Sequence, residues 1–410
     1  MNLQRENYPI ITRKISDMDE CKNRFSVKIA FILPLIVSGG GANRFLAEYA
    51  EAFRKKGYNV RIYSLIYDPE RTFDSFRRLN IEASRNARLS KLAGKITKWS
   101  ISRWRRIVSP PLLLIGLILE SLLVLKAYFT YRPQVIFVTG NHTLIGLLSL
   151  VLRKCRFVCY YHGLPPTLEW NSLFIRPLRL LEKFTMLKCL VLANSTFTAQ
   201  LIMRKVKETH IKVIHPGVDF SRFANLQKFD DGKVLINVGR IHPAKKQHFL
   251  IHLMNKLRNI EGVKLIILGF VESEQYLNEL HKLVRNYGLE DKITFVYYHA
   301  RGEELVDFLS RSTIYLHPSI ETFGISIVEA MAAGVPVIAY KEGGQRDIVS
   351  HGVDGFLAGD SLEEWVNYIN ILLTDRALLE KMSQAAKKKA TMFSWDRAVD
   401  KFERLLYSST

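Results

Sequence analysis

The sequence predicts an α/β protein made of two domains that each contain a parallel sheet. Near-continuous apolar, β-rich runs alternate with segments of helical pattern, from "VKIAFIL" near the start to "VPVIAY" and "GFLAGD" near the end. Strands that are apolar on both faces and separated by helices are typical of parallel sheets covered on both sides. A chain of 410 residues is also too long for one ordinary hydrophobic core.

The alternation is interrupted once, by the polar and irregular stretch "HPGVDFSRFANLQKFDDGK" over residues 215–233. Such a stretch is typical of a linker between domains. We therefore expect four parts, which are a polar tail over 1–25, an N-terminal domain over 26–216, a C-terminal domain over 217–394 and a last helix over 395–410.

The composition limits the function classes. Hydrophobic residues at 48% and charged residues at 24% indicate a globular chain. The formal charge of +20 favours an anionic partner, which could be nucleic acid, an acidic membrane surface or a phosphorylated ligand. Nucleic acid is the weakest of these, because no known reading module is present and the aromatic residues do not form a stacking platform.

The cysteines and the N-terminus favour a reducing, cytoplasmic setting. Cys21, Cys155, Cys159 and Cys189 are scattered and form no C-x-x-C pair, so neither a disulfide framework nor a zinc site is predicted. Residues 1–25 are polar and mixed in charge, and they contain no apolar core of a secretory signal.

A basic segment and a hydrophobic segment occupy residues 85–129. Residues 85–106 hold eight basic residues and no acidic one, so a helix there could lie on an anionic membrane or be an ordinary solvated face. The apolar run over 112–125 has fourteen residues and contains Glu120. A membrane span needs ~20 apolar residues, and a central carboxylate costs on the order of 3 kcal/mol. We expect this run to pack against the sheet.

Three motifs carry the candidate chemistry. "SGGGANR" over 38–44 follows a strand and opens a helix, where glycines and a helix N-terminus favour an anion, although Arg44 replaces the third glycine of a dinucleotide fingerprint. "VGRIHPAKKQ" places Arg240 and Lys245 after a strand, where they can neutralise a diphosphate. "HPSIETFGISIVEAMAAGVPVIA" places Glu321 in a loop and Glu329 on the following helix, and two carboxylates accept well from sugar or ribose hydroxyls.

These motifs resemble the retaining GT-B glycosyltransferases of family 4, whose E-x7-E motif matches Glu321 to Glu329. Further matches, such as "YYHGLPP", "LANSTFTAQL", "VIHPGVDFSRF" and "EGGQRDIV", follow in the family's order across roughly residues 27 to 405. The resemblance implies a GT-B fold, with two Rossmann-like domains whose parallel sheets face each other across a cleft. It also implies that the last helix crosses back onto the N-terminal domain.

The resemblance implies roles for particular residues. Arg240 and Lys245 would hold the donor diphosphate, Glu321 would face the donor sugar and Glu329 would bind the ribose. His142 is the candidate on the acceptor side, because Thr139 stands where many relatives carry histidine; the alternative is a shifted loop in which His142 is only satisfied. Asp347 stands where relatives often carry glutamate. The remaining predicted substrate-binding residues are Gly39, Gly40, Gly41, His162, Phe323, Gly324, Ile325 and Ser326. An alternative for His162 is that it only caps its strand.

The predicted activity is transfer of a hexose, with mannose as the first guess, from a nucleotide diphosphate sugar to a lipid-linked or membrane-borne glycan acceptor. No metal and no cofactor is expected, because Arg, Lys and a helix N-terminus replace Mg²⁺ in such enzymes. We expect a protein on the cytoplasmic face of a membrane. The alternatives are a sugar-nucleotide epimerase of the same fold and a non-catalytic sugar-nucleotide-binding partner subunit.

Overall fold

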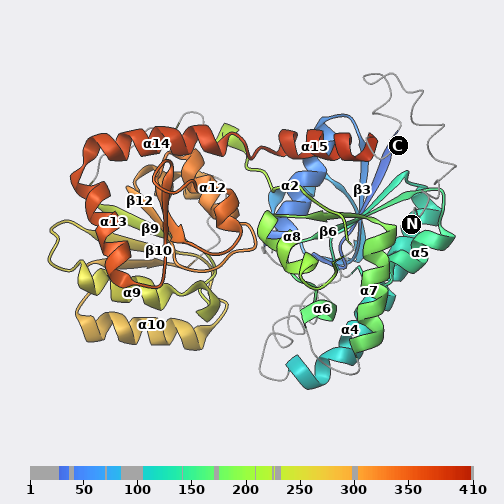
Figure 1. Cartoon of the computed structure of the whole chain (residues 1–410), viewed down its shortest axis with the longest axis horizontal. Coiled ribbons are helices and arrows are strands. Elements are labelled where there is room, and N and C mark those ends of the chain that lie inside the picture. The colour runs from blue at the N-terminus through green and yellow to red at the C-terminus, as the bar shows by residue number, and fades with distance from the viewer. Residues whose placement is uncertain are drawn as a thin grey trace, which may run out of the picture. The chain divides into compact units, whose positions relative to one another are not determined.

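The structure is a computed structural model that divides into two compact units (Figure 1). It describes residues 27–36, 41–69, 72–84, 105–140, 142–169, 175–207, 209–223, 226, 232–297 and 303–407. Unit 1 lies within residues 1–194, 198–214 and 398–410, and unit 2 comprises residues 195–197 and 215–397. The predicted tail over 1–25 and the basic segment over 85–104 lie outside the described residues.

Unit 1 contains a sheet in which the described strands all pair in parallel, as predicted. The strand order is β2-β3-β1-β5-β6-β7-β8, and β4 pairs with β3. The strands are β1 (Lys28–Ile32), β2 (Leu35–Ile36), β3 (Asn59–Tyr67), β4 (Asn80–Ser84), β5 (Val135–Val138), β6 (Arg156–Tyr161), β7 (Leu190–Ala193) and β8 (Ile211–Val213). Because β1, β5 and β6 are neighbours and parallel, the loops that follow them meet at one edge of the sheet.

Helices cover both faces of this sheet. They are α2 (Gly41–Lys55), η2 (Asp74–Arg78), α4 (Arg105–Tyr131), α5 (Ile145–Val151), α6 (Pro166–Glu169), α7 (Arg176–Lys188), α8 (Thr196–Met203) and α15 (Trp395–Tyr407). The described part of the chain thus supplies crossover helices between most neighbouring parallel strands, as parallel connections require.

Aromatic side chains form the core between the sheet, α2 and the last helix. Phe31, Phe137 and Tyr160 come from β1, β5 and β6, and Phe402 comes from α15. The Phe402 ring lies 5.8 Å from Phe137 and 5.3 Å from Phe53 of α2. The residues of α15 from Ala398 onwards therefore belong to the core of unit 1, although they follow unit 2 in the sequence.

Helix α4 packs against the sheet with one side only. It contacts β1 and β3 and buries Leu117, Leu123 and Val124, as the sequence predicts for this run. Its other side exposes Leu114, Ile115, Ile118, Leu119 and Leu122. Among the described residues, Leu113–Tyr131 is long and apolar enough to cross a membrane by length and composition alone, and only 28% of its apolar window is buried.

Unit 2 contains a second sheet with strand order β11-β10-β9-β12-β13-β14, and its described strand pairs are also parallel. The strands are β9 (Val234–Val238), β10 (Lys264–Leu268), β11 (Ile293–Val296), β12 (Ile314–His317), β13 (Val337–Tyr340) and β14 (Gly355–Ala358). The helices are η4 (Phe220–Phe223), η5 (Pro243–Lys245), α9 (Gln247–Lys256), α10 (Glu274–Tyr287), α11 (Glu303–Ser310), α12 (Ile325–Ala332), η6 (Gly344–Asp347), α13 (Leu362–Thr374) and α14 (Arg376–Ala390).

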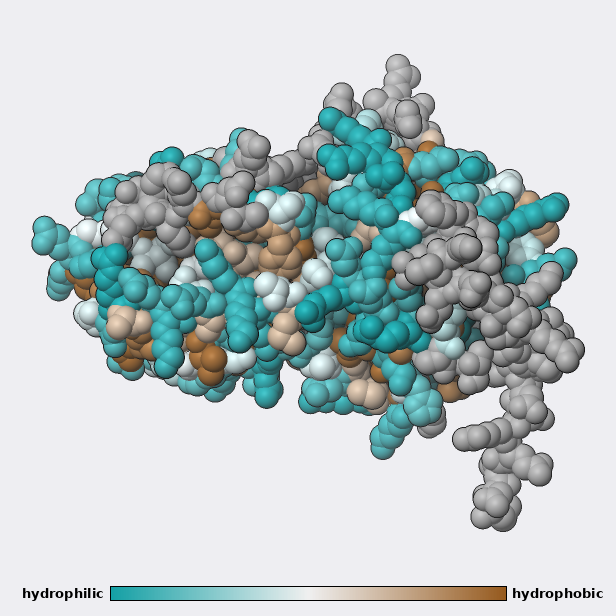
Figure 2. Space-filling model, turned by 90° about the horizontal axis from the view of Figure 1, so that it is seen from above, coloured by the Kyte–Doolittle hydropathy of each residue, from teal (hydrophilic) through white to brown (hydrophobic). Residues whose placement is uncertain are grey.

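Alternate residues of these strands enter two different cores. Leu235 and Leu316 pack with α9, α10 and α13, whereas Ile236 and Tyr315 pack with α11 and α12. This alternation follows from the two-residue period of a strand and explains why the strands read as continuous apolar runs. Outside these cores the surface is largely hydrophilic on the face that Figure 2 shows, with hydrophobic residues in small groups.

Phe402 offers a test of the packing of α15 on unit 1. Phe402→Ala removes a ring that is 1% exposed, and we expect it to lower the free energy of unfolding by about 3–5 kcal/mol, because the cavity is lined by aromatic rings that cannot collapse into it. Arg404→Ala, on the exposed side of the same helix, is the control. Urea denaturation of both variants makes the measurement, and equal midpoints would contradict this account.

Candidate functional site in unit 2

Glu321 lies in a loop between a buried strand and a short helix of unit 2. β12 ends at His317, and α12 begins at Ile325 after Gly324, whose φ of 113° lies in the left-handed region. Few residues other than glycine adopt this conformation. The sharp turn at Gly324 therefore separates the loop that carries Glu321 from the start of the helix.

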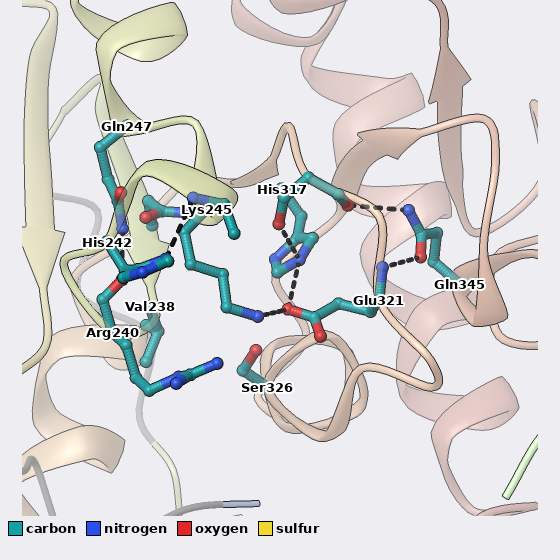
Figure 3. A network of polar contacts seen from close by, with 12 residues as sticks. Val238, Arg240, His242, Lys245, Gln247, His317, Glu321, Ser326 and Gln345 are labelled. Carbon is teal, nitrogen blue, oxygen red and sulfur yellow. Dashed lines mark hydrogen bonds and ion pairs between the residues drawn. The ribbon is translucent and has the colours of Figure 1, made fainter. Parts of the chain in front are cut away.

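The Glu321 carboxylate is the centre of a polar network (Figure 3). Lys245, at the end of η5, forms an ion pair with its Oε1. The same oxygen lies 3.1 Å from His317 Nε2, and His317 itself is buried. Figure 3 shows Lys245 reaching across to Glu321 from the segment that follows β9, so the network joins two segments far apart in sequence.

The backbone of the Glu321 loop is fixed by the segment that follows β13. The buried Gln345 side chain accepts from the Glu321 N–H at 3.1 Å and donates to the Ser319 carbonyl at 3.0 Å. The Gly344 N–H donates to the Glu321 carbonyl at 2.7 Å. A Cβ at Gly344 would lie 2.2 Å from the Thr322 carbonyl oxygen, so the second glycine of "EGG" allows the two segments to touch.

These contacts determine the charge of Glu321. Its side chain is 20% exposed, and burial alone would raise its pKa, but Lys245 and His317 together hold the pKa well below its ordinary value. The carboxylate is therefore ionised at neutral pH. It presents a fixed negative charge and hydrogen-bond acceptors beside a lysine, an arrangement that suits a polyhydroxyl ligand with an anionic group.

Arg240 lies near this network, two residues beyond β9. In Figure 3 the ends of the Arg240 and Lys245 side chains point toward the same space beside Ser326. The Arg240 guanidinium donates to both oxygens of Glu272 at 2.9 and 2.6 Å and is 42% exposed, so a ligand can reach it. The Gln247 side chain donates to the Arg240 carbonyl at 2.8 Å and fixes the backbone there.

The N-terminus of α12 faces the same part of unit 2. The first backbone bonds of this helix run from Ile327 and Val328 to the Gly324 carbonyl, so the amides of Gly324, Ile325 and Ser326 have no acceptor within the helix. The Ser326 hydroxyl accepts from Tyr315 at 2.9 Å, which fixes its position. Amides at a helix start favour an anion such as a phosphate.

Phe323 and Glu329 lie deeper than their predicted roles suggest. The Phe323 ring is 2% exposed and stacks on His215 with ring centroids 5.5 Å apart, so only its backbone can reach a ligand. Glu329 on α12 is 1% exposed, and its Oε1 lies 3.5 Å from a nitrogen of Arg222. The ion pair with Arg222 gives Glu329 a fixed position within unit 2.

Asp347 follows the glycine turn and holds two segments of unit 2 together. Its carboxylate accepts from the Thr196 N–H at 2.7 Å and lies 2.9 Å from His215 Nε2. Burial alone would raise the pKa of Asp347, but the bonds from His215 and Thr196 lower it. The Asp347 carboxylate therefore already has hydrogen-bonding partners within the protein.

His142 and His162 belong to unit 1 and follow β5 and β6. His142 is 2% exposed, its Nε2 lies 3.1 Å from the Val138 carbonyl, and burial lowers its pKa to about 4. Burial also lowers the pKa of His162 to about 3. The His162 ring packs against Phe45, with the ring centroids 5.1 Å apart. Both rings are therefore neutral at physiological pH. Of the two His142 ring nitrogens, Nε2 bonds to the backbone, whereas Nδ1 is buried without a hydrogen-bonding partner among the described residues.

The glycine motif is described only in part. Gly41 begins α2 and is exposed, with open space where a Cβ would lie, whereas Gly39 and Gly40 lie outside the described residues. Gly41 belongs to unit 1, as do His142 and His162, while Arg240, Lys245, Glu321 and the start of α12 come together in unit 2.

Sequence reasoning missed the residues that hold the site in place. His317, Gln345, Glu272 and Arg222 contact the predicted residues, yet none of them was a candidate. A histidine that ends an apolar strand directly before "PSIE" is the one signal that the sequence offered. The other three lie at separations along the chain that only folding brings together.

Two family models match this chain. The model described as "Glycosyltransferase Family 4" matches residues 39–222, and the model described as "Glycosyl transferases group 1" matches residues 219–389. The two matches follow each other along the chain and include every candidate residue of both units. The chain belongs to the group 1 glycosyltransferases of family 4.

Curated relatives of this glycosyltransferase are similar at modest identity. It is 25% identical to the human alpha-1,3/1,6-mannosyltransferase ALG2 over 85% of this chain and 88% of the relative. It is 26% identical to the GDP-Man:Man(3)GlcNAc(2)-PP-Dol alpha-1,2-mannosyltransferase of Mus musculus over 92% of this chain and 86% of the relative. It is 32% identical to the D-inositol 3-phosphate glycosyltransferase of Mycolicibacterium smegmatis, but over only 51% of this chain and 50% of that protein.

Solved structures show the fold of this glycosyltransferase. The Anabaena HepE structure in complex with UDP matches with a TM-score of 0.72 at 21% identity, covering 93% of this chain and all of HepE. The sucrose-phosphate synthase of Thermosynechococcus elongatus matches with the same TM-score and identity. These neighbours are GT-B glycosyltransferases, so the predicted GT-B class is confirmed.

The depressed pKa of Glu321 predicts a pH-dependent stability. A carboxyl whose pKa is lowered in the folded state stabilises the protein above its unfolded pKa, ordinarily 4.5, and this contribution is lost as the pH falls through the folded value. Glu321→Gln should therefore unfold at a lower temperature than the wild type at about pH 7, and this difference should shrink toward about pH 3. Thermal melts measure it, with the exposed Glu342→Gln as control. A pH-independent difference would contradict the assigned charge.

Proposed function

We propose that this glycosyltransferase transfers a hexose, with mannose as the first candidate, from a nucleotide diphosphate sugar to a lipid-linked or membrane-borne glycan. The observation that supports this most is the convergence of Arg240, Lys245 and the start of α12 around the ionised Glu321 (Figure 3). Two cationic side chains and a helix N-terminus suit a diphosphate, and a neighbouring carboxylate suits the hydroxyls of a sugar.

Arg240 and Lys245 would stabilise the leaving nucleotide. As the bond between the sugar C1 and the diphosphate oxygen breaks, negative charge grows on that oxygen, and preorganised cations lower the barrier most at this point. Arg240 is held by Glu272 and Lys245 by Glu321, so both side chains are ordered before a donor binds. The amides at the start of α12 would bind the remaining phosphate oxygens.

The sugar and nucleotide would be held by the two glutamates of the E-x7-E motif. Glu321 would accept hydrogen bonds from hydroxyls of the donor sugar, and Glu329 would accept from the ribose after a local adjustment, because its carboxylate is now buried beside Arg222. The acceptor hydroxyl would attack C1 from the face of the leaving group, with its proton passing to the departing phosphate oxygen. This course retains the anomeric configuration and needs no covalent nucleophile and no metal.

The names of relatives support the choice of donor and acceptor. ALG2 is named a mannosyltransferase, and the Mus musculus relative is named for a GDP-mannose donor and an acceptor linked to PP-Dol. HepE was solved with UDP and with UDP-glucose. We therefore place mannose first among the sugars and a nucleotide diphosphate sugar as the donor class.

Nucleotide release from a donor panel tests the proposal. UDP-, GDP- and ADP-sugars are incubated with a membrane lipid extract in EDTA, and release from one donor that depends on the lipid is expected. Arg240→Ala should lower kcat/KM by roughly 10²–10³-fold, because it removes a charge that stabilises the leaving group. Arg258→Ala, exposed on unit 2, is the control.

Other outcomes of this assay contradict parts of the proposal. Inhibition by EDTA would exclude a metal-independent transfer. Epimerised donor without any acceptor would indicate a sugar-nucleotide epimerase. Nucleotide binding with no release from any donor would indicate a binding subunit that supports a separate transferase.

We further propose that the outer side of α4 rests on an anionic membrane on the cytoplasmic face. Ile115, Ile118 and Leu122 are 52%, 48% and 55% exposed on one side of this helix. An apolar helix side on a chain of formal charge +20 fits the interface of a bilayer that contains acidic lipids. A peripheral position there would bring the N-terminal domain to a membrane-borne acceptor.

Vesicle flotation tests the membrane contact. The wild type should float with vesicles that contain phosphatidylglycerol, and Ile118→Glu combined with Leu122→Glu should reduce the bound fraction by about tenfold or more, because two charges would enter the apolar layer. Val353→Glu, at an exposed apolar position of unit 2, is the control. Unchanged flotation of the double variant would show that another surface makes the contact.

A further inference from the structure

Helix α7 of unit 1 carries a buried carboxylate that binds three hydroxyl groups. The Glu182 side chain is 0% exposed. Its Oε1 accepts from the Tyr161 hydroxyl at 2.5 Å, and its Oε2 accepts from Thr143 at 2.5 Å and from Thr167 at 3.2 Å. Burial raises the pKa of Glu182, and the three hydroxyl donors oppose that rise.

Of the three hydroxyls, one lies in the loop after β5 and the other two lie at the two ends of the loop after β6, and these loops carry the candidate acceptor residues. Thr143 directly follows His142 in the loop after β5. Tyr161 ends β6 directly before His162, and Thr167 is the second residue of α6, directly after "HGLPP". Since β5 and β6 are neighbouring parallel strands, one carboxylate fixes both loops at the edge of the sheet where ligands of such sheets bind.

A second residue of α7 fixes the same region one helical turn further on. The Thr185 hydroxyl donates to the Thr143 carbonyl at 3.0 Å and accepts from the Gly146 N–H at 2.9 Å. A Cβ at Gly146 would lie 2.6 Å from the Thr185 Cα, so α5 begins in direct backbone contact with α7. Glu182 and Thr185 lie three residues apart and therefore share one side of α7.

The hydrogen bonds of this cluster suit a side chain with two accepting oxygens. Both oxygens of Glu182 accept hydrogen bonds, whereas the amide of glutamine has one acceptor oxygen and an NH₂ group that only donates. With glutamine, the hydroxyls on the NH₂ side, either Tyr161 or the two threonines, would have to turn and accept from it, and each would lose the acceptor for its own hydrogen. Because all four side chains are buried, water cannot replace the lost bond.

We propose that Glu182 and Thr185 are positioning residues of the acceptor site, which hold the His142 and His162 loops in the geometry that binds the acceptor. This inference rests on the proposed function, in which the N-terminal domain binds the acceptor. Neither residue touches the reacting atoms; they act through Thr143, Tyr161 and Thr167. The proposed donor residues belong to a different compact unit of the chain.

Matched variants separate positioning from stability. Tyr161→Phe and Thr143→Val each remove one bond to Glu182, and Thr143→Ser keeps the hydroxyl. Tyr58→Phe is the control, because it removes a bond of the same kind, from a buried tyrosine to Glu403 at 2.6 Å, elsewhere in unit 1. With the full-length chain, the KM for the lipid acceptor should rise about tenfold in Tyr161→Phe and Thr143→Val, while the KM for the donor changes less than about twofold.

The control and the conservative variant should keep the acceptor KM of the wild type. An unchanged acceptor KM in Tyr161→Phe and Thr143→Val, or an equal rise in Tyr58→Phe, would overturn the positioning role while leaving the proposed function intact. A wild type that transfers nothing would overturn the proposed function instead.

Hydrogen exchange of the full-length chain tests the cluster without any activity. Amides of residues 142–152 and 161–169 should exchange about tenfold faster in Tyr161→Phe and Thr143→Val than in the wild type, and at the wild-type rate in Tyr58→Phe. Faster exchange confined to these two segments would support the role of Glu182 as their common anchor. Unchanged exchange in both segments would overturn it, whatever the outcome of the transfer assay.

Discussion

The ion pair between Lys245 and Glu321 is the interaction on which the unit 2 site depends. It joins the segment after β9 to the loop after β12, and it needs both partners in fixed positions. His317 orients the carboxylate, and Gln345 and Gly344 hold the backbone of its loop. The Glu321 side chain, which we propose binds the donor sugar, is therefore supported from several segments, and this support keeps a charged group both ordered and accessible.

In unit 1, too, the loops at the edge of the sheet are held by a shared hydrogen-bonding side chain. There the buried Glu182 joins the loops that follow β5 and β6, as Gln345 joins the loops that follow β12 and β13 in unit 2. In both units a buried polar side chain is satisfied by groups from loops at one edge of a parallel sheet. Such loops have no ladder of backbone hydrogen bonds, so a shared hydrogen-bonding partner holds them in one conformation.

The sequence predicted the two parallel α/β sheets because the strands are buried on both faces and read as apolar runs. It also placed Arg240, Lys245 and Glu321 in loops near the motif strands, and these side chains converge in unit 2 as parallel topology allows. It did not predict that Arg240 would be held by Glu272 or that the Phe323 ring would be buried against His215. It expected α4 to pack against the sheet, but not that one side would stay apolar and exposed.

The sequence by itself determined the α/β class, the order of the elements and the positions of the charged residues of the motifs. These follow from local periodicity and from the position of charged residues at strand ends, which are properties of short segments. The tertiary structure decided which oxygen each charged group contacts and which aromatic rings are buried. It also decided which loops share a buried hydrogen-bonding side chain. His142 illustrates the difference. The sequence places it after β5, whereas the packing of its ring on Tyr161 exists only once β6 lies beside β5.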